Sequence, residues 1–127
     1  MNKIRFTLAG VIAMTMLTVG LAHAESDAIQ TMAKITLNLN HFPSDDDKAA
    51  LEAIVDSDES SEEEAAIAMA LTNLQHKVTE ADAERLAAIV EDSESDASAR
   101  ELAGIVLKIN HAASADDKAV LATLAGN

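Results

Sequence analysis

The sequence predicts an all-α protein of three tandem helix–turn–helix hairpins, six helices stacked as a small right-handed-type solenoid or as a compact bundle. Two observations predict this fold. Apolar residues recur at the three- and four-residue spacing of amphipathic helices, and related segments recur every 35 residues along the chain. Self-similarity with a period of about 20–50 residues is typical of repeat architectures, in which neighbouring units bury a shared core.

The repeat is clearest in a short phrase that begins with histidine. HFPSDDDK begins at His41 and HAASADDK at His111, and the more divergent HKVTEADA begins at His76. The period is close to the roughly 34 residues of tetratricopeptide arrays, but the chain has no Trp and no Tyr, which that pattern expects, so no family is assigned. Apolar positions align in the same register: Met32, Ile67 and Leu102; Leu39, Leu74 and Ile109; Leu51, Leu86 and Leu121; Ile54, Ile89 and Leu124.

Each copy is expected to hold two helices. The first helix of the first copy carries Ile29, Met32 and Ile35 on one face, and the second carries Leu51 and Ile54. A linear stack of such hairpins predicts that Leu→Ala costs more stability in the central copy, at Leu86, than in the last, at Leu121. The helix starts are predicted from capping boxes, a hydroxyl residue followed three residues later by an acid: Ser44 and Asp47, Ser61 and Glu64, Thr79 and Asp82, Ser114 and Asp117.

The first 24 residues are expected to be a secretory signal peptide. Lys3 and Arg5 precede an uncharged apolar run, residues 8–21, and Ala22-His23-Ala24 is an A-x-A cleavage site. An uncleaved membrane anchor is the competing interpretation, because residues 6–24 carry no Asp, Glu, Lys or Arg and are nearly long enough to span a bilayer. Cleavage predicts a periplasmic or secreted protein that begins at Glu25.

The remainder has the length of one domain. It is expected to be a single helical-repeat domain, residues 25–127, with copies at about 25–59, 60–94 and 95–127. The whole chain has 22 acidic and 9 basic residues and a net charge of −13. Cleavage of the leader would remove Lys3 and Arg5 and make the net charge more negative by two. Such a charge repels nucleic acids and anionic membranes, so neither is an expected partner.

The three repeated histidines are candidate metal ligands or proton-linked groups. The sequence, however, favours separate roles, in which each imidazole complements the negative C-terminal end of a first helix. Packed helices lie about 8–10 Å apart, whereas zinc requires nitrogens within about 2.1 Å of one ion. We therefore expect His41, His76 and His111 to lie too far apart to share an ion, and no metal site is predicted.

Acidic connectors between the copies are weak candidates for divalent cations. An EF-hand loop requires Gly at its sixth position and Glu at its twelfth, and counting from Asp56 gives Ser61 and Ile67 instead. The connectors are therefore expected to be solvated linkers, with loose ion binding as the alternative. The candidate side chains are Asp56, Asp58, Glu59, Asp92, Glu94 and Asp96.

No enzymatic function is predicted, and no cofactor. The chain has no Cys and only 4 Gly, and it lacks a Gly-rich phosphate loop. The predicted function is a non-catalytic, exported interaction or scaffold protein whose acidic surface binds a basic protein or peptide. The alternative is a binding protein that responds to divalent cations or to pH through the acidic connectors and the repeated histidines.

Overall fold

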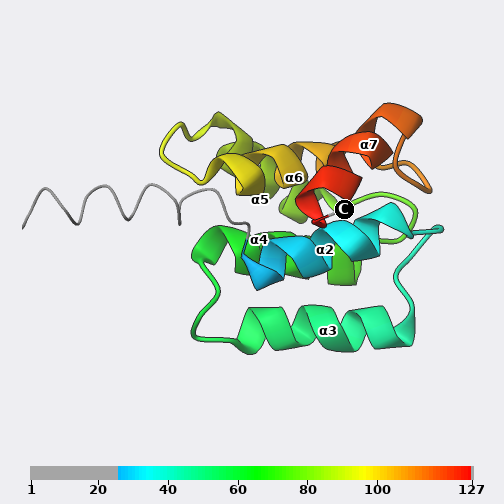
Figure 1. Cartoon of the computed structure of the whole chain (residues 1–127), viewed down its shortest axis with the longest axis horizontal. Helices are drawn as coiled ribbons and strands as arrows, with labels where there is room; N and C mark the ends of the chain where they lie inside the picture. Colours follow the sequence, from blue (N-terminus) through cyan, green and yellow to red (C-terminus); the bar gives the residue numbers. More distant parts are fainter. Residues whose placement is uncertain (1–25, 127) are drawn as a thin grey trace, which may run out of the picture.

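The computed structural model, which describes residues 26–126, is a compact all-α bundle of six helices (Figure 1). The described residues form no β-strand and only isolated bridges between single pairs of residues. The predicted all-α fold with six helices is thus confirmed for the described residues. The helices form the compact bundle and not the solenoid, the other arrangement that the sequence left open. The leader and its cleavage site lie outside the described residues. The helices are α2 (Asp27–Leu37), α3 (Asp45–Asp56), α4 (Glu62–Asn73), α5 (Glu80–Glu91), α6 (Ala97–Lys108) and α7 (Ala115–Leu124).

The closest helix pairs are not the expected hairpins. The most extensive contacts join α3 to α4, α5 to α6, and α2 to α7, so the last helix packs against the first. By contrast, α2 makes few contacts with α3, and α6 makes few with α7. In Figure 1 the short connectors α3–α4 and α5–α6 lie at one end of the bundle, and the loops after α2, α4 and α6 lie at the other. Among the described residues, no helix is long and apolar enough to cross a membrane.

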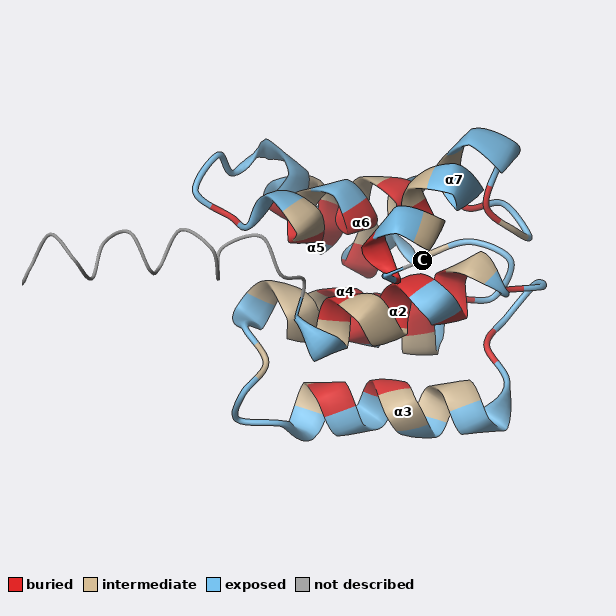
Figure 2. Cartoon of the chain, viewed as in Figure 1, coloured by how far each residue is buried: buried red, intermediate tan, exposed pale blue. Residues whose placement is uncertain are grey.

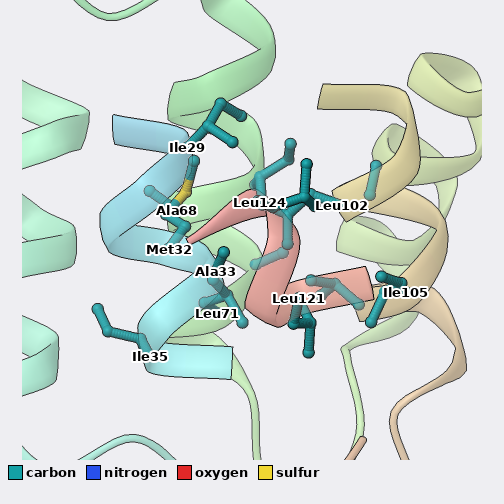
Figure 3. Close-up of a cluster of buried hydrophobic side chains, with 14 of the residues drawn as sticks. Ile29, Met32, Ala33, Ile35, Ala68, Leu71, Leu102, Ile105, Leu121 and Leu124 are labelled. Carbon is teal, nitrogen blue, oxygen red and sulfur yellow. The ribbon is translucent and has the colours of Figure 1, made fainter. Parts of the chain in front are cut away.

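The core is made of aliphatic side chains from all six helices. The inner helices α2, α4 and α6 contact one another and each contribute several fully buried side chains, among them Met32, Ile67 and Leu102. Buried residues line the facing sides of the helices and exposed residues cover their outer sides (Figure 2). Figure 3 shows Leu121 and Leu124 of α7 inserted among side chains of α2, α4 and α6.

The predicted caps begin the helices, with one difference in the second half of the chain. Complete capping boxes form between Ser44 and Asp47 and between Ser61 and Glu64. The hydroxyls of Thr79 and Ser114 also accept from the backbone three residues on, at distances of 3.2 and 3.1 Å. The acids of these two pairs, Asp82 and Asp117, do not complete a capping box. Asp82 accepts from Asn73 and from the Thr79 hydroxyl, and Asp117 pairs with Lys108 at 3.1 Å.

Candidate metal centre

Three loops at one end of the bundle adopt the same unusual backbone conformation. His41, His76 and His111 have φ angles of 74°, 70° and 74°, in the left-handed region. Each stands between two residues that form an isolated antiparallel bridge, so each is the tip of a tight reversal. Asn, Asp and His enter this region more readily than other non-glycine residues. The position still strains an L-residue by about 1–2 kcal/mol relative to glycine.

The three loops are tied together by a closed ring of backbone hydrogen bonds. The N–H of His41 donates to the carbonyl of His111 at 2.7 Å, and the N–H of His111 donates to the carbonyl of His76 at 2.7 Å. The N–H of His76 donates to the carbonyl of His41 at 2.8 Å, which closes the ring. Every histidine thus gives one hydrogen bond and receives one, and the ring holds the three reversals in place around one point.

This ring brings the three imidazoles together at the surface. Their ring centroids are 4.7–5.1 Å apart, with the rings edge to face. One ligand nitrogen from each of them lies within 4.8 Å of the other two, and solvent reaches the cluster. Nδ1 of His76 lies 3.0 Å from Nδ1 of His111, a hydrogen-bond distance. In neutral imidazoles one of these two nitrogens donates and the other offers a lone pair.

A neighbouring amide orients the third imidazole. Nδ1 of His41 lies 2.7 Å from Oδ1 of Asn40. An amide oxygen only accepts, so Nδ1 of His41 is the donor in this contact, and the neutral tautomer that makes it has its lone pair on Nε2. Histidines that ligate metals commonly donate their other N–H to a carbonyl or carboxylate in this way, which fixes the tautomer and the ring orientation.

The cluster has the composition and nearly the dimensions of a three-histidine metal site. Tetrahedral zinc with bonds of about 2.0–2.1 Å places its nitrogen ligands about 3.3–3.4 Å from one another. In this cluster Nδ1 of His76 and Nδ1 of His111 are 3.0 Å apart, and one ligand nitrogen from each histidine lies within 4.8 Å of the other two. Small side-chain rotations would therefore bring three nitrogens to the spacing that zinc requires. Imidazole favours zinc, copper, nickel and cobalt, whereas calcium and magnesium prefer oxygen ligands.

Charged side chains of both signs surround this end of the bundle. The helices that follow the histidine loops begin with acidic residues: Asp45, Asp46 and Asp47 in α3, Glu80 and Asp82 in α5, Asp116 and Asp117 in α7. Five lysines lie at the same end: Lys34 and Lys108 near the ends of α2 and α6, Lys48 and Lys118 near the starts of α3 and α7, and Lys77 next to His76. The local charge is therefore mixed, with a small excess of negative charge.

The expected separation of the histidines is wrong. That expectation took the distance between packed helices as the distance between equivalent residues. The helices end before the histidines, at Leu37, Asn73 and Lys108, and the loops carry each histidine into the hydrogen-bonded ring. The sequence did carry one signal for the backbone: histidine is among the few non-glycine residues that enter the left-handed region more readily.

The acidic candidates are not gathered in the same way. Among residues 26–126, the only group of three or more potential metal ligands that lie close together is the three-histidine cluster. Two of the connector acids instead bind the backbone. Asp92 accepts from the N–H of Glu94 at 2.9 Å, and Asp96 caps α6 by accepting from Ser98 at 2.9 Å. Asp56, Asp58, Glu59 and Glu94 also stay outside the cluster.

Replacing a ring histidine by glycine should not destabilise the fold. We expect His111→Gly to leave the free energy of unfolding unchanged or raise it by about 1 kcal/mol, because glycine enters the left-handed region without strain. His111→Val should lower it by at least about 1 kcal/mol, because a β-branched residue is strained there. Urea denaturation of both variants measures this difference. A large loss of stability in His111→Gly would mean that the imidazole itself holds the fold together.

No known protein family, curated protein or solved structure matches this chain.

Proposed function

We propose that this protein binds one transition-metal ion through His41, His76 and His111 and acts as a metal-binding protein in the exported compartment. The observation that carries the proposal is the convergence of three imidazoles, with ligand nitrogens within 4.8 Å of one another, from loops 35 residues apart. Zinc and divalent copper are the ions that such a set suits best among the common ones.

The backbone strain supports a functional role for the imidazoles. Glycine would occupy the three reversals at lower cost, yet histidine stands at all three. Residues held in strained conformations concentrate at ligand-binding and active sites, where the surrounding structure maintains them. Hydrogen bonding alone does not require imidazole here, because the closed ring uses only backbone groups.

The repeat gains a chemical explanation in this proposal. Three related segments, spaced 35 residues apart, would each supply one ligand to the same ion. The contact between α2 and α7 supports a closed ring of copies over an open solenoid, because it joins the first copy to the last. An open stack would separate the first and third histidines and leave the ligand set incomplete.

Calorimetric titration with Zn²⁺ tests the proposal. We expect one ion per chain, and at least about 100-fold weaker binding in each of His41→Asn, His76→Asn and His111→Asn, because loss of an outer-shell partner alone costs about 10–100-fold. Asparagine is the appropriate substitution, since it tolerates the left-handed backbone. As a matched control, Asp58→Asn removes a connector carboxylate and should leave zinc affinity unchanged. Equal zinc binding by the parent and by all three histidine variants would reject the proposal.

The interaction or scaffold function and the exported location remain predictions from the sequence. One observation favours a protein partner: Phe42, beside His41, is a large apolar side chain that is 57% exposed. A basic partner captured at low salt and lost at high salt would support that function. Such a partner could bind with or without metal, so the titration above tests the metal site independently.

A further inference from the structure

Two grooves lie at the end of the bundle that holds the α3–α4 and α5–α6 connectors, opposite the histidines (Figure 1). One runs between α2 and α3 and the other between α4 and α5. Every residue that lines the α4–α5 groove has a counterpart, 35 positions earlier, that lines the α2–α3 groove. The α2–α3 groove encloses about 530 Å³ and the α4–α5 groove about 270 Å³. The larger volume falls in the range of about 300–1,000 Å³ that is typical of ligand sites.

An arginine of the chain itself lies along the smaller groove. Arg85 extends from α5 towards α4, where its Nη1 lies 3.5 Å from Sδ of Met69. Its counterpart in the α2–α3 groove is Ala50. Glu63, another long side chain of the α4–α5 groove, corresponds to Ala28. The α2–α3 groove is therefore larger because two alanines replace two long side chains, and the space that an arginine takes in its counterpart is open.

The α2–α3 groove combines an apolar floor with an acidic rim. Ile54, which is 8% exposed, forms the floor together with alanines of both helices. Asp27, Glu59 and Glu64 line the rim, and the ion pairs within residues 26–126 involve none of these three acids. The five lysines of the described residues lie at the histidine end of the bundle, and neither described arginine lines this groove. Negative charge at the rim is therefore not balanced by a neighbouring basic side chain of the groove.

We propose that the α2–α3 groove binds an arginine side chain of a basic partner peptide or protein. Arginine packs its aliphatic stem against apolar surface while its charged group stays at the polar edge. The planar guanidinium also binds carboxylates through paired hydrogen bonds. Ile54 and the alanines would contact the stem, and Asp27 and Glu59 would bind the guanidinium. The histidine cluster takes no part in this contact, so the inference is independent of the proposed metal site.

NMR titration of the metal-free protein tests the inference. The probes are an acetylated and amidated Ala-Arg-Ala peptide and the same peptide with citrulline, which resembles arginine in shape but carries no charge. We expect the arginine peptide to bind with a dissociation constant of about 1 mM or below and to shift the backbone amide signals of Ala28, Ala53 and Ile54. The citrulline peptide should bind at least about tenfold more weakly, because hydrogen bonds to charged groups are the stronger ones.

Filling the groove from within the chain provides the decisive variant. Ala50→Arg places an arginine at the position that Arg85 holds in the α4–α5 groove, so the new side chain should occupy the α2–α3 groove and weaken the arginine peptide at least about tenfold. Ala119→Arg is the matched control. It adds the same charge at an exposed position of α7 that lies outside the groove, and it should change the affinity by less than about twofold at 0.1 M salt, where the Debye length is about 10 Å.

A second variant covers the case in which Ala50→Arg does not fold, as judged by circular dichroism. Asp27→Asn with Glu59→Gln keeps the shape of the rim and removes two of its charges, and it should weaken the arginine peptide by a similar factor. The inference is overturned if the arginine peptide leaves the signals around the groove unchanged, or if the citrulline peptide binds as tightly. It is also overturned if Ala119→Arg weakens binding as much as the groove variants do, because attraction would then come from the acidic surface as a whole.

Discussion

Zinc at about 100 times its dissociation constant should raise the melting temperature of the protein by about 10–20 °C. A ligand that binds only the folded state adds about 2.7 kcal/mol at that concentration, and each kcal/mol corresponds to about 4–8 °C for a domain of this size. The unfolded chain separates the three histidines by 35 residues each and cannot present them together. Differential scanning calorimetry with and without zinc measures the shift.

His76→Asn is the control for that shift. The variant keeps the left-handed turn and the backbone ring but removes one ligand, so zinc should raise its melting temperature by less than about a quarter of the parent value. Calcium should give no comparable shift in either protein, because imidazole is a poor ligand for it. A zinc shift that persists in His76→Asn would place the ion elsewhere on the acidic surface.

Leu86→Ala and Leu121→Ala should each lower the free energy of unfolding by about 2–5 kcal/mol, and by similar amounts. Both side chains are fully buried. The sequence-based expectation of a smaller loss at Leu121 assumed that α7 is an exposed terminal helix. In the structure α7 packs against α2 and inserts Leu121 into the shared core (Figure 3), so that expectation loses its basis.

Denaturant unfolding of the two variants measures this comparison. Leu107, which is only partly buried at the edge of the core, provides the matched control, and Leu107→Ala should cost less than either. A loss at Leu121 below half of that at Leu86 would indicate that the contact between α7 and α2 contributes little to stability.

Local sequence patterns predicted the helices well. The hydroxyl–acid pairs mark where α3, α4, α5 and α7 begin, because a cap depends only on residues within one turn. The apolar spacing identified the buried positions for the same reason. The partner of each helix could not be predicted in this way. Whether α3 packs on α2 or on α4 depends on the path of two loops and on the burial that all six helices achieve together.

The convergence of the three histidines was missed for a related reason. The histidines were recognised as repeated, but the distance between packed helices was taken as their separation. Their convergence depends on the positive φ of each loop and on backbone hydrogen bonds between residues far apart in the chain. Neither follows from periodicity. Glycine would fit these three positions better than histidine. That mismatch indicates a functional site, but it can be recognised only when the φ angles are known.

X-ray absorption at the zinc edge determines whether three imidazoles hold one ion. For the protein loaded with one equivalent of zinc, we expect three imidazole nitrogens at about 2.0–2.1 Å, plus one further light atom. Removing His41 as His41→Asn should lower the imidazole count by one. A first shell of oxygen atoms without imidazole scattering would place zinc on carboxylates and rule out the three-histidine site.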